Sequence, residues 1–554
     1  MSAASGLPSD LPGLLGELLA DQAELSAVDV FSRRHDEGAL PAVRVYEERI
    51  PVGRTPGPHE QLAFRVDLDR CTGCKACVTA CHAMNGLAEE ETWRDVGLLL
   101  GEGEGAGFQQ TVTTACHHCE DPGCLAGCPV KAYEKDPVTG IVRHLDDQCI
   151  GCQYCLLKCP YDVPKYSVEL GIVRKCDMCT GRLAANEAPA CVQGCPNGAI
   201  AIEIVGVRGP GVTPELIPGT GASLPDAATT RPTTRYVTSR TSRPLRPANV
   251  GRLAPASAHD PLAVMLVGMQ LSVGALLFDC LAAAAGAGSS LALALAAGAA
   301  GLGLGAATLH LGRPLYAFRA FLGWRTSWMS REILVFGGYV PVLALTAATA
   351  LVAGFGAALP GLPPAAIPLA EAWLPPLRAA ALALGLAGTL CSVMIYVDTR
   401  RPAWALPRTA ALFGGSALSL GALALAAAWA LECRLAGADA APAIAVLAAV
   451  GLAASGAKLA VEWRLARRDA GEDDALSRSA RLLRGPLRDR FRARCALAAL
   501  GATSALGVLA CAAGGAAGGA LALSLSALAF STFGEVVERH LYFTSEAMPA
   551  MPGH

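Results

Sequence analysis

The sequence predicts a two-part molecule: a small α+β domain organised by cysteines, followed by an all-α bundle of membrane-spanning helices. Two observations support this prediction. Sixteen of the 21 cysteines lie between Cys71 and Cys195, a segment that contains only short apolar runs. From Pro261 onward the composition changes to Ala, Leu, Gly and Val, and 53% of the whole chain is hydrophobic. A chain of 554 residues is long enough to form both parts.

The cysteines fall into four groups of four, and a proline follows the last cysteine of three groups. The first and third groups have the spacing C-x2-C-x2-C-x3-C, whereas the second and fourth lengthen the middle gap. In iron–sulfur proteins with this spacing, three close thiolates hold one cluster and the fourth reaches a neighbouring cluster. The groups are Cys71, Cys74, Cys77 and Cys81; Cys116, Cys119, Cys124 and Cys128; Cys149, Cys152, Cys155 and Cys159; and Cys176, Cys179, Cys191 and Cys195.

Sixteen thiolates at four per cluster predict four [4Fe–4S] clusters in a double ferredoxin-like domain, which would be a path for single electrons. The near-symmetry of the groups predicts that the first and fourth exchange their last cysteines, as do the second and third. The expected ligand sets are Cys71, Cys74, Cys77 and Cys195; Cys81, Cys176, Cys179 and Cys191; Cys116, Cys119, Cys124 and Cys159; and Cys128, Cys149, Cys152 and Cys155.

Two other uses of cysteine fit this pattern less well. Structural zinc sites are usually built from two separated C-x2-4-C knuckles, which does not explain the C-x2-C-x2-C-x3-C-P run. Disulfides need an oxidising compartment, and cysteines only two residues apart cannot pair without strain. We find no secretory signal, because the pair Arg33-Arg34 is followed by charged residues and not by an apolar stretch.

The spacing of the apolar residues divides the chain into five parts. Leucines at helical spacing near the N-terminus (Leu11, Leu14, Leu15, Leu18 and Leu19) predict one amphipathic helix. Strand-like runs at 62–68, 140–144 and 199–205 flank the cysteine groups, and a segment rich in Gly, Pro, Ser and Thr follows. The predicted parts are an N-terminal extension (1–60), the cluster domain (61–205), an extended connector (206–258), the membrane anchor (259–540) and a C-terminal tail (541–554).

Eight segments are long and apolar enough to cross a bilayer, which needs about 20 residues per helix. They are apolar all round, whereas a helix of a soluble protein has one polar face. The predicted spans are 262–284, 291–310, 333–357, 378–397, 410–431, 443–462, 495–513 and 517–534.

Arginines are distributed unequally between the two sides of the predicted bundle. Seventeen lie in the loops after spans two, four and six, and only Arg378 and Arg434 lie on the other side. The positive-inside rule therefore places the cluster domain in the cytoplasm, on a multi-pass protein of the cytoplasmic membrane. These arginines adjoin membrane spans and do not form a basic aromatic surface, so we expect no nucleic-acid partner.

Two stretches of the sequence resemble a known family. The segments CHHCEDPGCLAGCP and CIGCQYCLLKCP resemble the electron-transfer subunit of the dimethyl sulfoxide reductase family of molybdoenzymes. The segment LHLGRPLYAFRAFLGWRTSWMSREIL (309–334) resembles the quinone-reactive, eight-span anchor of the same enzymes. These are normally two polypeptides, and here they look fused. Respiratory nitrate reductases have tryptophan at the position of Cys152, so the cysteine here favours four complete cubanes.

The resemblance implies a partner subunit that carries a molybdenum bis-pterin cofactor and performs the substrate chemistry. Among relatives, membrane-bound sulfite dehydrogenase fits best, because its catalytic subunit faces the cytoplasm and passes electrons to quinone. The alternative is a reductase that carries electrons from menaquinol to dimethyl sulfoxide or another oxo-acceptor. A redox module of a hydrogenase or formate dehydrogenase, and a zinc-bearing membrane scaffold, are less consistent with the sequence.

The resemblance also points to a quinone site for ubiquinone or menaquinone. His310 ends the second span and Glu332 begins the third, and ionisable residues near membrane depth are usually functional. We expect both to transfer protons to or from the quinone, with Arg313 as a further hydrogen-bond donor. The structural alternative is that His310 caps its helix and Glu332 pairs with Arg313 or Arg331. No haem is expected, because the histidines of the membrane half do not form facing axial pairs.

Overall fold

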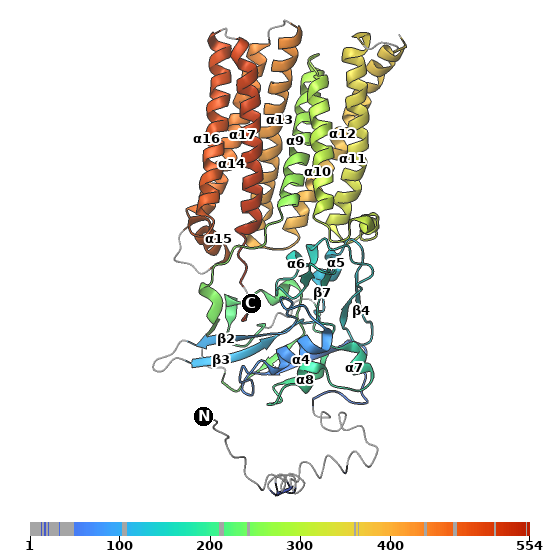
Figure 1. Cartoon of the computed structure of the whole chain (residues 1–554), viewed down its shortest axis with the longest axis vertical. Helices are drawn as coiled ribbons and strands as arrows, with labels where there is room; N and C mark the ends of the chain where they lie inside the picture. Colours follow the sequence, from blue (N-terminus) through green and yellow to red (C-terminus); the bar gives the residue numbers. More distant parts are fainter. Residues whose placement is uncertain are drawn as a thin grey trace, which may run out of the picture.

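The computed structural model describes residues 49–101, 108–209, 215–240, 244–358, 362–363, 365–436, 440–468, 474–514, 517–549 and 551–553, together with Gly13, Gly16, Glu17, Ala20 and Arg33. It consists of a small mixed domain at one end of a long helical bundle (Figure 1). The leucines of the predicted N-terminal amphipathic helix lie outside the described residues. The predicted fold class is confirmed: a ferredoxin-type domain with small sheets precedes eight candidate membrane spans.

Two three-stranded sheets form the frame of the cluster domain. The first has the order β8 (Ile200–Gly206), β1 (Glu60–Asp67), β9 (Arg235–Val237), with β1 and β8 antiparallel. The second has the order β10 (Leu245–Pro247), β2 (Asp95–Gly101), β3 (Phe108–Thr114). The long antiparallel pair joins the segment before the first cysteine group to the segment after the last, so the cysteine loops lie between its ends.

Short hairpins and helices carry the cysteine loops between these sheets. The hairpins pair β4 (Tyr133–Lys135) with β5 (Val142–His144), and β6 (Lys165–Ser167) with β7 (Ile172–Arg174). Three of these strands, β1, β5 and β8, lie where the sequence predicted strand-like runs. The helices are α4 (Ala76–Asn85), α5 (Gly123–Gly127), α6 (Tyr154–Lys158), α7 (Thr180–Ala184) and α8 (Ala190–Gln193).

The segment expected to be an extended connector differs from that expectation, because it packs into the cluster domain. Its strands β9 and β10 pair with β1 and β2, and Tyr236 and Leu245 are buried. Asp69 anchors this segment by accepting hydrogen bonds from Thr238 Oγ1 at 2.8 Å and from the Ser239 backbone at 2.6 Å. The physical reason is that β1 and β2 each offer an unpaired edge, which an extended chain can occupy.

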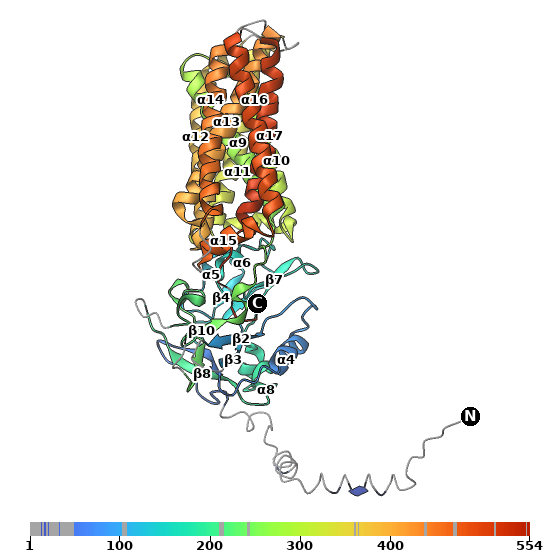
Figure 2. The ribbon, with the colours of Figure 1, turned by 90° about the vertical axis from the view of Figure 1, so that its left-hand side faces the viewer.

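The membrane half contains eight helices that are long and apolar enough to cross a bilayer, as predicted (Figures 1 and 2). Their bounds are α9 (Asp260–Ala284), α10 (Ser290–Leu309), α11 (Trp328–Phe355), α12 (Ala366–Val397), α13 (Leu406–Ala436), α14 (Ala441–Ala466), α16 (Arg488–Gly514) and α17 (Ala517–Thr544). Several extend beyond the predicted spans by one to three turns, because helices continue past the apolar stretch that crosses the bilayer.

Small residues allow close contact between helices inside the bundle. A Cβ atom on Gly274 of α9 would lie 1.9 Å from the carbonyl oxygen of Ala417, and one on Gly421 of α13 would lie 2.2 Å from the backbone of Gly274. The backbones of α9 and α13 therefore touch directly at this point. Close packing through glycine and alanine is the usual way in which membrane helices associate without a hydrophobic driving force between them.

The junction between the two halves is built from short elements and from the C-terminal segment. An irregular helix, η4 (Pro314–Phe321), and the amphipathic helix α15 (Ala475–Arg484) lie at the cluster-domain end of the bundle. Figure 2 shows α15 between the bundle and the cluster domain. Beyond α17 the tail enters the cluster domain, where Met551 is buried and its carbonyl accepts a hydrogen bond from Asn249 at 3.1 Å. The tail predicted from residue 541 is thus helical to Thr544 and then part of the cluster domain.

Candidate functional site

The four cysteine groups share one backbone feature. The residue before the second cysteine of each group has a positive φ: Gly73 (72°), His118 (41°), Gly151 (69°) and Met178 (61°). This left-handed conformation is easy for glycine but costly for a side chain such as that of histidine or methionine. Its recurrence shows that each group forms the same tight loop, which turns successive thiols toward one centre.

The structure brings cysteines of different groups close together. One cavity is lined by Cys71, Cys74, Cys77 and Cys195, and another by Cys116, Cys119, Cys124 and Cys159. The thiol of Cys81 lies within electrostatic range of Cys179 and Cys191, and Cys155 within range of Cys128, Cys149 and Cys152. The last cysteines of the first and fourth groups thus lie beside each other's loops, and so do those of the second and third.

The surroundings of these thiols fit iron–sulfur clusters. Backbone N–H groups donate to sulfur at Cys128, Cys149, Cys176 and Cys195, over distances from 3.2 to 3.4 Å. Burial raises the pKa of Cys81 and of Cys124 to about 12, so these thiols would be protonated without a metal. Iron supplies the positive charge that a buried thiolate requires, and hydrogen bonds to sulfur tune its potential. When bound, such clusters carry single electrons.

A buried lysine separates the two inner cysteine sets. Lys175 is only 3% exposed, and its ammonium group donates to the carbonyl of Cys176 at 2.9 Å and to the sulfur of Cys116 at 3.7 Å. It therefore lies between the set that contains Cys176 and the set that contains Cys116. The four sets consequently form a row, and the set that contains Cys152 lies at the membrane end.

The loops of this last set dock directly on the bundle. The backbone N–H of Arg313 donates to the carbonyl of Ile150 at 3.0 Å, and the Tyr154 hydroxyl donates to the carbonyl of Ile395 at 2.7 Å. The Gly151 loop lies against Gly312, where an added Cβ atom would lie 2.9 Å from the Gly312 backbone. The absence of side chains at these two glycines allows the cysteine loop and the loop after α10 to stack without a gap.

A narrow pocket at this contact contains both predicted proton-transfer residues. It is lined by Cys152 from the cluster domain, His310 at the end of α10 and Glu332 at the start of α11. Glu332 is 4% exposed and accepts a hydrogen bond from the hydroxyl of Ser392 on α12. Tyr154 and Tyr396 complete the polar part of the wall. The two ionisable groups thus lie beside one cysteine of the candidate cluster nearest the membrane.

Arg313, in contrast, does not line this pocket. Its guanidinium group donates to the carbonyl of Asp146 at 3.0 Å and so fastens the cluster domain to the bundle. Arg331, the other cation suggested as a partner for Glu332, donates instead to the carbonyls of Trp324 and Arg325. The sequence could not show this, because loops that dock on another domain and loops that bind a ligand have the same composition.

His259 is a member of the pocket that sequence reasoning missed. It precedes α9 directly, and its ring packs edge-on against the ring of His310, with centroids 5.0 Å apart. Burial, together with the neighbouring His310, lowers the pKa of His259 to about 4. Its position at the start of the first span is the only sequence feature that could have suggested a role.

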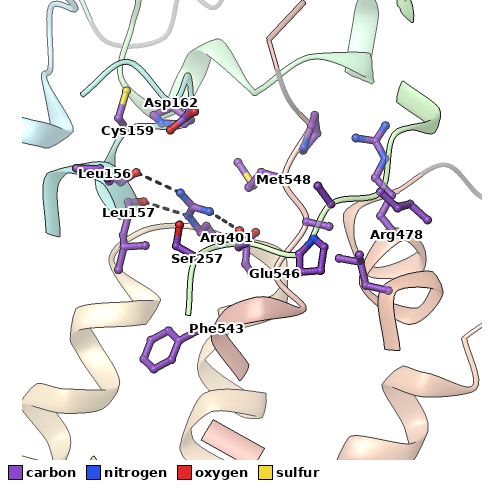
Figure 3. A pocket seen from close by; sticks show the side chains of 18 of the residues that line it. Leu156, Leu157, Cys159, Asp162, Ser257, Arg401, Arg478, Phe543, Glu546 and Met548 are labelled. Atoms are coloured by element: carbon purple, nitrogen blue, oxygen red, sulfur yellow. Dashed lines mark hydrogen bonds and ion pairs between the residues drawn. The ribbon is translucent and has the colours of Figure 1, made fainter. Parts of the chain in front are cut away.

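A larger cavity of about 450 Å³ lies beside this pocket (Figure 3). Its walls come from α6, the segment 249–259, α15 and the C-terminal tail. In Figure 3 the guanidinium of Arg401 lies centrally, bonded to the carbonyls of Leu156 and Leu157 and paired with Glu546. Phe543 forms part of the membrane side of the cavity.

Comparisons with known proteins agree with the cysteine geometry. Residues 108–204 match the model of the 4Fe–4S dicluster domain family, and residues 62–83 match that of a 4Fe–4S binding domain. The Hydrogenase-2 operon protein HybA of Escherichia coli O157:H7 is 37% identical over 191 residues, which are 29% of this chain and 56% of HybA. The chain thus spans about half the length of that relative.

Two further relatives match over most of their own length. The probable anaerobic dimethyl sulfoxide reductase subunit YnfG of Escherichia coli K12 is 38% identical over 148 residues, which are 25% of this chain and 72% of the relative. The B subunit of anaerobic dimethyl sulfoxide reductase from Haemophilus influenzae is 37% identical over 150 residues, which are 26% of this chain and 73% of the relative. This chain therefore belongs to the family of iron–sulfur electron-transfer subunits that includes the B subunit of anaerobic dimethyl sulfoxide reductase.

Proposed function

We propose that this chain is the electron-transfer and membrane-anchor subunit of a molybdopterin oxidoreductase, which connects a separate catalytic subunit to the quinone pool through four [4Fe–4S] clusters. The pocket shared by Cys152, His310 and Glu332 is the observation that supports this proposal most strongly. It places two proton-transferring side chains beside a candidate cluster ligand, at the membrane surface. Quinone chemistry needs both, because two electrons and two protons move together.

In this proposal the side chains of the pocket bind the quinone ring and exchange its protons. Glu332 and His310 approach from adjacent helices, so each can serve one of the two quinone oxygens. The wall residues Leu157, Leu262 and Met329 are apolar and suit the ring faces. The pocket is narrow, so quinone entry requires these side chains to move apart.

We propose that the cluster domain faces the cytoplasm and that electrons run from substrate to quinone. The arginine-rich loops, η4 and α15 all lie at the cluster-domain end of the bundle, which supports this orientation through the positive-inside rule. Sulfite is the substrate that we propose for the partner's molybdenum site, on the sequence resemblance described above.

The second candidate is a reductase in which electrons run from menaquinol to dimethyl sulfoxide or another oxo-acceptor. The names of the relatives favour it, because two of those described above are subunits of anaerobic dimethyl sulfoxide reductase. The arrangement of the cysteine sets and the pocket serves either direction equally well.

Sulfite-dependent quinone reduction in inside-out membrane vesicles tests the proposal. These vesicles present the cytoplasmic face to an impermeant substrate. We expect activity with the native chain, and its loss with Cys152→Ser or His310→Leu. Cys511→Ser is the matched control for the first variant, since Cys511 lies far along α16 and should leave the rate unchanged.

The outcomes separate the two candidates. Sulfite activity in inside-out vesicles supports both the cytoplasmic orientation and the oxidising direction. Quinol-dependent reduction of dimethyl sulfoxide in right-side-out vesicles, without sulfite activity, would instead establish the reductase and reverse the orientation. Full activity of the His310→Leu protein would contradict the proposed quinone site.

A further inference from the structure

The two cavities at the junction share one polar wall residue. The narrow pocket with His310 and Glu332 and the larger cavity of about 450 Å³ are separate, but His259 and Leu157 line both. Leu157 is apolar and cannot carry a proton. His259 is 8% exposed, with the ring of His310 on one side and that of Phe543 at 5.5 Å on another. It therefore stands as a partition between the two spaces.

The larger cavity, which we call the junction chamber, has the properties of a water-filled space. The residues 254–257 that form one wall are exposed, so the chamber opens to solvent. Glu546, only 5% exposed, is paired through Oε2 with Arg401. Within the described residues, its other oxygen, Oε1, has no hydrogen-bond partner. A roomy cavity with an unsatisfied buried carboxylate oxygen normally holds ordered water.

We propose that His259 passes protons between water in the junction chamber and the quinone pocket. This inference rests on the proposed quinone site and adds the route by which its protons reach solvent. A neutral imidazole has one N–H donor and one acceptor nitrogen, so it can accept a proton on one nitrogen and release one from the other. The ring is neutral at physiological pH because burial holds its pKa at about 4.

The balance of the reaction sets what the route must deliver. Reduction of one quinone consumes two electrons and two protons and forms an O–H bond at each quinone oxygen. The electrons come one at a time from the iron–sulfur clusters, and the protons come from chamber water through His259, which returns to its starting state after each transfer. Quinol oxidation runs the same route outward. The titratable groups around His259 are Asp260, His310, Glu332, Tyr154, Tyr396 and Glu546.

Two variants of the full chain, with its clusters reconstituted, test the inference in proteoliposomes. His259→Leu removes the proton carrier, and His259→Gln retains polarity without an imidazole. A fluorescent hydroxyquinoline N-oxide reports occupation of the quinone pocket, and stopped-flow absorbance reports reoxidation of reduced clusters by a short-chain quinone in H₂O and D₂O. His540→Leu is the matched control, because His540 bonds to Asp260 at 2.6 Å and lines neither cavity.

We expect both His259 variants to bind the N-oxide within about twofold of the native chain. Cluster reoxidation should slow by about tenfold or more, in line with the usual contribution of a proton-transfer group, and the solvent isotope effect should rise. Imidazole added to the solution can enter the chamber and should restore the rate. A side chain with only a structural role would give neither the isotope effect nor this rescue.

Three results would overturn the inference, and they differ from failure of the proposed function. Unchanged rates in both variants, with His310→Leu inactive, would leave the quinone site intact and remove His259 from the route. Loss of N-oxide binding without rescue by imidazole would make His259 part of the binding wall. If the native chain neither binds the N-oxide nor is reoxidised by quinone, the proposed function itself fails.

Discussion

The cluster domain and the membrane bundle both bury chemically demanding side chains, but they satisfy them in different ways. In the cluster domain, cysteines form part of the two hydrophobic clusters that make its core, and their thiolates require iron from outside the chain. In the bundle, six buried charges neutralise one another: Glu462, Glu535, Glu538, Lys458, Arg494 and Arg539. The fold of one half therefore depends on a cofactor, whereas the charges of the other half are balanced within the chain.

The charges of the bundle form one connected network. Glu535 on α17 accepts from Lys458 on α14 and pairs with Arg494 on α16 at 3.1 Å. Arg494 also pairs with Glu462 at 2.8 Å, and Glu538 pairs with Lys458 at 3.2 Å. Three acids and three bases balance, which is the condition for charges to persist in a low-dielectric interior.

The largest effect is expected from removing one thiol of the cluster domain. Cys116→Ser should lose the cluster of its set, because a hydroxyl is a poor ligand for iron, and total iron should fall by about a quarter. The buried Lys175 would then lack its negative partner. Iron analysis and limited proteolysis of the cluster domain would measure both changes.

Cys433→Ser in α13 is the control for this variant, since Cys433 belongs to no cysteine set. Its iron content and proteolysis should match those of the native chain. A Cys116→Ser protein with full iron and native resistance to protease would show that the cluster domain does not depend on its cofactor, and would remove the contrast with the bundle.

A smaller effect is expected from unbalancing the bundle network. Glu535→Gln removes the charge that Lys458 and Arg494 share, and breaking a buried ion pair costs about 3–5 kcal/mol. We expect a lower midpoint of thermal unfolding in detergent, followed by circular dichroism, with unchanged iron content before unfolding. Glu371→Gln, an exposed acid on α12, should leave the midpoint unchanged. A native midpoint for Glu535→Gln would mean that the network contributes no stability.

The smallest effect is expected from filling a backbone contact. Gly274→Ala places a methyl group 1.9 Å from the carbonyl oxygen of Ala417, so α9 and α13 must separate. Such overpacking costs about 1–3 kcal/mol. Gly298→Ala on α10 has open space around the new methyl group, and it should be neutral or slightly stabilising in the same thermal measurement. Equal midpoints for the two variants would show that the contact between α9 and α13 is not tight.

Side chains far apart in the sequence illustrate where prediction from the sequence stops. Lys458 and Glu462 are one helical turn apart and could pair on the same helix. The structure instead pairs each with a residue of another helix. The partners lie 77 and 32 residues away, and apolar segments of similar composition do not show which of them will face each other.

The sequence by itself determined the cysteine groups and the spans, because both depend on local spacing. Loops of two or three residues between thiols set which cysteines can share a centre, and about 20 apolar residues suffice to predict a membrane helix. The positions of His310 and Glu332 at adjacent span ends also followed from local order. Only the tertiary structure decided that His259 joins them, that Arg313 docks the cluster domain, and that segment 206–258 completes its sheets. These contacts join residues far apart in the chain, and packing alone selects them.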